Sequence, residues 1–193
     1  QGVAERYVEA PLGSHTELSP GAAGALFATL DDLTRWLEVH VNEGIAGGNR
    51  LVSTGNLKEM HSPHTIIPSS GVSEVLFGDS ILTYGLGWMI EPYRGRTLVH
   101  HGGNVEAHSL IVGFVPSEKL GVVVLCNVAA TFLRDALLYE ALDRALGNEP
   151  NDWSGKFHSL ADPLLAGQAR SKTTSAAERV AGAPPSRLLE EFV

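Results

Sequence analysis

Apolar residues downstream of residue 25 recur with a helical period. One face carries apolar side chains at i, i+3, i+6, i+7 and i+11, namely Leu30, Leu33, Trp36, Leu37 and Val41. Thr29 and Asp32 have the spacing of a capping box, and Gly44 is a typical helix end. The pattern therefore predicts an amphipathic helix between Thr29 and Gly44, with this apolar face turned to the core.

A short helix and two strand pairs follow in the pattern. The segment beginning at Ser53 predicts a helix that ends before Pro63. Residues 64–83 show only weak periodicity, which is typical of a long loop at the rim of a pocket. Beyond this loop, "YGLGWMIEP" and "RTLVHH" predict one hairpin, and "SLIVGFVP" and "VVVLCN" predict a second.

A second long helix comes after the strands. Residues 131–147 place leucines and alanines on one side, and Gly147 is a typical C-cap. One helix before the strands and one after them indicate an α+β fold, in which an antiparallel sheet is flanked by helices. From Asn151 the composition changes to a helix-like piece, an Ala/Ser/Thr stretch and "GAPPS", which together predict a helical extension and linker.

Composition and charge narrow the classes of partner. The 193 residues carry a formal net charge of −8 and no run of Lys or Arg, which argues against nucleic acid or a membrane surface as a partner. No apolar run approaches the roughly 20 residues of a membrane span. Cys126 lies in an apolar run and is expected to be a buried, unreactive side chain. One cysteine and no visible signal peptide are compatible with a cytoplasmic protein.

Many catalytic signatures do not occur in these 193 residues. Neither S-x-x-K, K-T-G nor G-x-S-x-G is present, and no tyrosine begins Y-x-N or Y-x-S. The glycine patterns that bind nucleotide phosphates are also missing, as are C-x-x-C and H-E-x-x-H. No cofactor is therefore expected.

The histidines give little support for a metal site. His61 and His64 are three residues apart and are expected to lie on a solvated helix end and loop. His100 and His101 are adjacent, so a regular strand directs their side chains to opposite faces. No residue is assigned as a metal ligand.

The stretch "VHHGGNVEAHS" is the strongest candidate for chemistry. Gly102 and Gly103 allow close approach of a ligand and are expected to end the strand at unusual dihedral angles. An amide just past such a glycine can donate to an oxyanion, and an imidazole at the strand end can donate to a substrate or assist proton transfer. A plain glycine turn flanked by half-exposed histidines stays open as the alternative.

Several short motifs follow one another in a fixed order along the chain. They are Asp32-Leu33-x-x-Trp36, then Tyr84-Gly85-x-Gly87-Trp88, then H-x-G at His101–Gly103, followed by Pro116 and Asn127. This order resembles the C-terminal half of the serine β-lactamase-like family, which includes class C β-lactamases, penicillin-binding-type peptidases and related esterases, and the similarity covers about residues 4–147. Each of these matches is weak alone, and their order and spacing make the resemblance specific.

The resemblance implies roles for individual residues. H-x-G often stands where β-lactamases have K-T-G, so His101 and Gly103 would line the active site opposite the nucleophile. The amide of Asn104 would be an oxyanion donor, whereas His100 would face the other side of the strand. Tyr84 and His108 are the expected substrate-binding residues; His108 stands near where relatives usually have an aromatic residue, which gives the pocket a different shape.

The resemblance also implies an activity. The parent protein would be a serine hydrolase that cleaves an ester, an amide or a β-lactam through an acyl-enzyme. Residues 1–150 would be the C-terminal portion of its β-lactamase-like domain, and residues 151–193 a helical extension and linker toward a missing C-terminal segment.

The nucleophilic Ser, its Lys and the Tyr motif would lie in a missing N-terminal half, which is the expected partner of this chain. Without that half, the chain is expected to be inactive and to expose an unpaired strand edge and an apolar helix face. Two alternatives stay open: a non-catalytic binding or regulatory remnant of the same scaffold, and an unrelated α+β domain whose histidines are structural or bind a metal.

Overall fold

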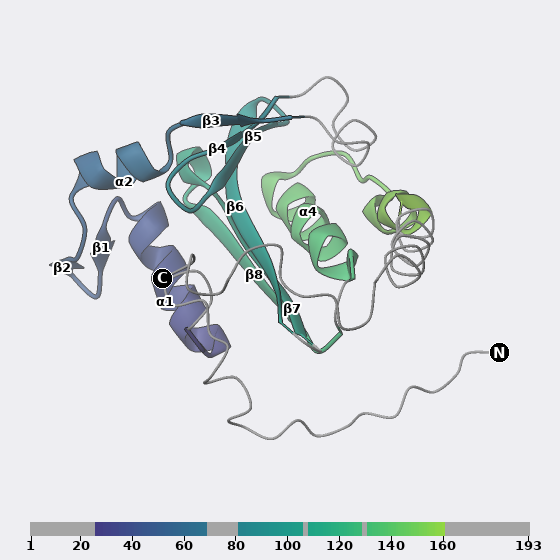
Figure 1. Cartoon of the computed structure of the whole chain (residues 1–193), viewed down its shortest axis with the longest axis horizontal. Helices are drawn as coiled ribbons and strands as arrows, with labels where there is room; N and C mark the ends of the chain where they lie inside the picture. The colour runs from purple at the N-terminus through teal and green to yellow at the C-terminus, as the bar shows by residue number, and fades with distance from the viewer. Residues whose placement is uncertain (1–25, 69–80, 106–107, 129–130, 161–193) are drawn as a thin grey trace, which may run out of the picture.

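A six-stranded antiparallel sheet lies between helices in the computed structural model, which describes residues 26–68, 81–105, 108–128 and 131–160. Helices α1 (Leu30–Val41) and α2 (Thr54–Met60) lie on one side of the sheet, and α4 (Leu133–Leu146) lies on the other (Figure 1). The predicted α+β fold, an antiparallel sheet flanked by helices, is confirmed.

Each strand of this sheet pairs with its neighbour along the chain. The strands are β3 (Thr65–Ile67), β4 (Leu82–Tyr84), β5 (Met89–Tyr93), β6 (Arg96–Val105), β7 (His108–Val115) and β8 (Leu120–Cys126). A short 3-10 helix, η2 (Pro116–Glu118), connects β7 to β8. A separate small hairpin of β1 (Ile45–Ala46) and β2 (Asn49–Arg50) follows α1.

Local signals in the sequence explain the helix ends. The side chain of Thr29 accepts from the amide of Asp32, and the Asp32 carboxylate accepts from the amide of Thr29, so the predicted capping box is confirmed. Ser53 caps α2 in the same way, through the amide of Asn56. Gly147 ends α4 with φ +66°, the left-handed conformation that favours glycine.

Two predictions about the strands are wrong. Strand β6 does not end at the glycine pair, because Gly102 and Gly103 continue the ladder opposite Ile111 and Leu110, and neither has a positive φ. The ladder reaches Val105, so extended pairing overrides the turn preference of the two glycines. The predicted loop 64–83 also contains β3 and β4, which pair with each other at its two ends; its residues 69–80 lie outside the described part.

The predicted apolar face of α1 is confirmed in part, because Leu37 is buried and Leu33 and Val41 pack against the buried cluster, whereas Leu30 and Trp36 are exposed. Its buried side chains are Leu37, Val39 and His40, whereas Trp36 is 43% exposed. The reason is the contact with β8, where Leu37 packs directly over Gly121. A Cβ at Gly121 would lie 2.9 Å from Leu37 Cδ1, so the bare glycine lets α1 approach the sheet.

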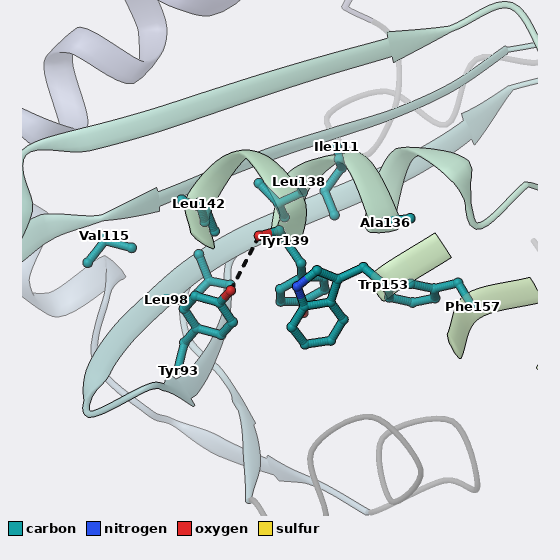
Figure 2. Close-up of a cluster of buried hydrophobic side chains, with 10 residues drawn as sticks. All are labelled: Tyr93, Leu98, Ile111, Val115, Ala136, Leu138, Tyr139, Leu142, Trp153 and Phe157. Carbon is teal, nitrogen blue, oxygen red and sulfur yellow. Dashed lines mark hydrogen bonds between the residues drawn. The ribbon is translucent and has the colours of Figure 1, made fainter. Parts of the chain in front are cut away.

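The α4 face of the sheet holds an aromatic core, shown in Figure 2. Tyr93 and Tyr139 lie beside Trp153 and Phe157, which come from a helical segment at residues 153–160. This segment follows α4 in the chain and packs on its side (Figure 1). The first residues after position 150 are therefore part of the same core as the sheet.

The α1 face of the sheet holds a second buried cluster, made of Leu37, Trp88, Ile90, Val99, Val112 and Phe114. Consecutive residues of β6 alternate between the two clusters: Leu98 belongs to the α4 face and Val99 to the α1 face. The helices in the described part of the chain are all too short or too polar to cross a membrane.

Candidate active site

Strand β6 has an open side at its C-terminal end. Strand β7 pairs with β6 from Val99 to Val105, whereas β5 pairs with β6 only from Arg96 to His100. Within the described residues, His101 to Val105 therefore have a strand neighbour on one side only. A strand edge of this kind presents backbone groups that another molecule can bind.

The backbone amide of Asn104 is directed to this open side. The carbonyl of Trp88 accepts from the amide of Gly85, on the β4 side of the hairpin. Backbone groups alternate in direction along an antiparallel strand, so the N–H and C=O of Met89, the residue after Trp88, point to β6. Met89 pairs with His100, whose backbone groups therefore point back to β5. Gly102 and Asn104, two and four residues further on, direct their backbone groups to the same side, beyond the end of β5.

His101 lies on the α1 face of the same strand end and contacts Tyr84. The Tyr84 hydroxyl lies 3.0 Å from His101 Nε2, and the two rings meet edge to face with centroids 5.9 Å apart. Both side chains are only partly buried. The contact fixes the orientation of the imidazole, and the choice of donor depends on its tautomer.

A close backbone contact places Tyr84. Gly85 lies against the end of α2, where a Cβ would be 2.3 Å from the carbonyl oxygen of Met60 and 2.9 Å from that of Ser62. The amide of Leu86 donates to the same Met60 carbonyl at 3.0 Å. Only a residue without a side chain fits there, which explains the first glycine of the Tyr-Gly-x-Gly-Trp motif.

On the opposite face, His100 is buried beside a carboxylate. His100 Nε2 lies 3.8 Å from Glu91 Oε1, and Glu91 accepts a hydrogen bond of 2.6 Å from the Tyr139 hydroxyl. Burial, with the nearby Glu91 carboxylate, raises the pKa of Tyr139 well above its usual value, so the phenol stays protonated and donating. His100 therefore faces away from His101, as the strand alternation predicts.

His108 shares the α1 face with His101 and lies apart from it. His108 is exposed and pairs with Val105, whereas His101 pairs with Val112. Four residues of a strand separate the two positions, about 13 Å at about 3.3 Å per residue. The structure thus brings Tyr84 and His101 into contact and places Gly103 and Asn104 further along the same strand end, and it leaves His108 on the neighbouring strand at the far end of the hairpin.

The sequence pattern does not predict a histidine pair in which His40 is buried and His61 half-buried. His40 Nδ1 lies 2.9 Å from His61 Nε2, with the rings of Trp88 and Phe114 around them. Burial, assisted by His61, lowers the pKa of His40 to about 4, and burial also lowers the pKa of His61. The expectation that His61 is solvated is therefore wrong, whereas His64 is exposed beside Glu59.

The remaining titratable side chains do not form a metal centre in the described part of the chain, which contains no group of three or more His, Cys, Asp or Glu able to hold an ion. Cys126 ends β8 and is half-buried rather than fully buried. The candidate site therefore consists of one imidazole, one phenol and a free strand edge.

Comparisons with known proteins identify the family of the chain. The Beta-lactamase family model matches residues 1–146, which is most of the chain. The chain belongs to the β-lactamase family. Its scaffold is that of a serine hydrolase-like protein.

Two fungal relatives are named hydrolases. Unguisins hydrolase ungD of Aspergillus violaceofuscus is 26% identical over 180 residues, which cover 86% of this chain and 31% of the relative. Unguisins hydrolase ungD′ of Aspergillus campestris is 23% identical over 192 residues, which cover 94% of this chain and 33% of the relative. The chain thus spans about a third of the length of these curated relatives.

A solved structure shares the fold. The octameric penicillin-binding protein homologue from Pyrococcus abyssi superimposes with a TM-score of 0.54 and 26% sequence identity, over 65% of this chain and 26% of that protein. The sequence comparisons and the structural comparison thus agree with the family that the order of motifs resembles.

Proposed function

We propose that the whole protein to which these residues belong is a serine hydrolase that cleaves an ester, an amide or a β-lactam through an acyl-enzyme. One observation carries the proposal: the His101 side chain and the backbone amide of Asn104 share the strand end where β5 has stopped. Membership of the β-lactamase family and two relatives named hydrolases support it.

In this proposal the chain supplies one wall of the site. A serine outside these residues attacks the substrate carbonyl carbon while a base takes its proton. The amide of Asn104 donates to the oxyanion of the tetrahedral intermediate, which collapses and expels the leaving group. Water then attacks the acyl-enzyme, and the acid product leaves with the serine restored.

His101 acts on the substrate from the α1 side of the strand. Tyr84 holds one edge of the imidazole through Nε2. The ring is thereby oriented to donate to a carbonyl or carboxylate of the substrate, or to assist transfer of a proton to the leaving group. His108 lies too far along the hairpin to act with it and would contact only an extended substrate.

The free edge of β8 is the proposed place for the rest of the domain. Among the described residues β8 pairs only with β7, and Leu125 on this strand is largely exposed. Leu133 and Leu137 of α4 are exposed as well. We infer that a further segment of the same protein pairs with β8 and covers this apolar surface.

A non-catalytic role is the second candidate. The observation that favours it is the lack of S-x-x-K in these 193 residues, since a site without a nucleophile retains only binding. In that case the same strand edge binds an ester, an amide or a β-lactam without forming a covalent adduct.

Covalent labelling decides between the two. The 193-residue chain and the protein at the length of its relatives are each incubated with a fluorophosphonate and with a reactive β-lactam, and intact mass is measured. We expect no adduct on the chain and one adduct on the longer protein. In the longer protein, His101→Ala should slow acylation about 10²-fold or more, whereas His64→Ala, on the exposed loop, should leave it unchanged.

Other outcomes overturn the proposal. A stoichiometric adduct on the 193-residue chain would place a nucleophile within these residues. Absence of any adduct on the longer protein, together with measurable binding of the same β-lactam, would establish the non-catalytic role instead.

A further inference from the structure

Arg134 joins α4 to the open end of β6. It is the second residue of the helix, and its guanidinium lies against the sheet on the face opposite His101. Nη1 donates to the carbonyl of Gly103, to Asn104 Oδ1 at 3.2 Å and to the carbonyl of Leu110 at 3.2 Å. One cation thus binds both strands of the hairpin at the last part of their ladder.

The geometry is particular to an arginine. The side chain is 15% exposed, and Nε lies 3.3 Å from Asp135 Oδ2, so the charge is compensated where it is buried. A planar guanidinium can donate to the carboxylate through one nitrogen and to several carbonyls through another. A lysine at this place has one compact charge and cannot reach both sets of acceptors in fixed directions.

Gly102 independently marks the same contact. A Cβ on Gly102 would lie 3.2 Å from Cζ and from Nη2 of Arg134, and 3.3 Å from the carbonyl oxygen of Leu110. Gly102 has no positive φ, so its backbone conformation is one that an alanine can adopt. A side chain at Gly102 would therefore displace the guanidinium by a few tenths of an ångström, whereas a turn plays no part at this position.

We propose that Arg134 is a positioning residue that holds the Gly103–Asn104 backbone so that the amide of Asn104 is aimed at the open side of β6. This inference rests on the proposed function, in which that amide is an oxyanion donor. Arg134 does not touch the substrate. It acts through the carbonyl of Gly103 and the side chain of Asn104, from behind the strand.

The strand needs such support because β5 has ended. From His101 onward, β6 has hydrogen-bonding strand partners only on β7 among the described residues. An edge held on one side can twist or shift, and a small displacement of a catalytic donor costs much of its effect. The guanidinium replaces the missing neighbour with a contact from the face of the sheet.

The first experiment tests position in the 193-residue chain by NMR. Arg134→Met keeps the length of the side chain without its donors, and Arg134→Lys keeps the charge. In Arg134→Met we expect the amide resonance of Asn104 to shift and the amide exchange of Leu110 to rise at least about tenfold. Arg134→Lys should restore part of the difference. Arg144→Met, which removes an exposed arginine paired with Glu140 on the same helix, is the matched control.

The second experiment tests function in the longer protein by its acylation kinetics with the fluorophosphonate. In Arg134→Met the maximal acylation rate should fall about 10- to 100-fold, while the half-saturating probe concentration changes less than threefold. Gly102→Ala pushes the guanidinium away without removing it and should act in the same direction, more weakly. If Arg134→Met does not fold, the acylation rates of Gly102→Ala and Arg134→Lys test the same role.

The outcomes separate the two proposals. An unchanged acylation rate in Arg134→Met and Gly102→Ala, in a longer protein that is acylated normally, overturns the role of Arg134 and leaves the proposed function intact. Lack of acylation in the unaltered longer protein overturns the proposed function, and the catalytic role of Arg134 with it. Unchanged Asn104 and Leu110 amides in Arg134→Met overturn the positioning itself.

Discussion

A buried carboxylate on the α4 face and a buried imidazole on the α1 face are accommodated in opposite ways. On the α4 face, a carboxylate that is 2% exposed collects hydrogen bonds from four side chains. Asp143 accepts from the hydroxyl of Tyr93 at 2.5 Å, from Arg94 at 2.9 Å, from the indole of Trp153 at 2.7 Å and from Asn148 at 2.9 Å. Here a buried charge is retained and surrounded by donors.

On the α1 face, the buried imidazole of His40 lies among aromatic rings beside the half-buried imidazole of His61. His40 and His61 bind each other, and within the described residues His40 Nε2 is buried without a hydrogen-bond partner. Among the described residues no carboxylate lies beside the pair to favour the charged form, so burial keeps both rings neutral.

This difference means that Asp143 and His40 lose their contributions to folding stability at different pH. Burial works to raise the pKa of Asp143, but its hydrogen bonds bring it below the usual 3.8, so this carboxylate contributes stability that is lost only as pH falls below about 3.8. The pKa of His40 is also lowered, from 6.5 to about 4, so its contribution is present above 6.5 and lost as pH falls toward 4.

Removing Asp143 should have the largest effect. Asp143→Ala removes the buried acceptor that four side-chain donors share, so we expect the free energy of unfolding to fall by about 3–5 kcal/mol. Urea unfolding at pH 7 measures it. Glu140→Gln breaks an exposed ion pair on the same helix and should cost no more than about 0.5 kcal/mol. Equal effects of the two variants would contradict the picture of the α4 face.

Acidification should have the next largest effect, and on the α1 face. Between pH 6.5 and 4 the His40 imidazole binds a proton in the unfolded chain but not in the folded one, so its contribution to stability falls with pH, by roughly 3 kcal/mol for a change of about 2.5 in pKa. His40→Phe should remove most of this slope. Ile90→Val, in the same cluster, should lower stability by about 1 kcal/mol at every pH and keep the slope.

If the stability of His40→Phe still falls between pH 6.5 and 4 as in the unaltered chain, another group titrates there. That result would contradict the difference described between Asp143 and His40. Unfolding followed by circular dichroism at intervals between pH 4 and 7 gives the necessary curves.

Tyr84→Phe should have the smallest effect. It removes one partly buried hydrogen bond, which contributes about 1 kcal/mol or less. We expect the ¹⁵N resonance of His101 Nε2 to move while the rest of the α1 face is unchanged. Thr83→Val removes a hydrogen bond of 3.0 Å to the carbonyl of Ile90 from the same strand. It should cost a similar amount and leave the His101 resonance in place; movement in both variants would show a general disturbance of β4.

Short-range signals explain what could be predicted from the sequence. The capping box of Thr29 and Asp32, the Ser53 cap and Gly147 each act within four residues, and each helix begins or ends where they predict. The alternation of β6 likewise predicted that His100 and His101 face opposite sides.

Contacts between distant residues explain what could not. His40 and His61 are 21 residues apart, and nothing in the period of either segment indicates that they meet. The local pattern predicts a turn at Gly102. The side chain that lies against it belongs to Arg134, which is 32 positions further along the chain and on another element, so no local pattern could indicate the contact. The depth of burial of an isolated histidine or glycine depends on tertiary packing, which a local pattern does not contain.

The pairing of every strand with its neighbour in the chain has a consequence for folding kinetics. From β4 to β8 each new strand adds to the one just made through a short connection, whereas β3 and β4 are joined by the longer segment 68–81. Most pairings of this sheet therefore close small loops, so its contact order is low and its assembly should be fast. During synthesis, this sheet can zip together hairpin by hairpin as it leaves the ribosome, with β8 added last.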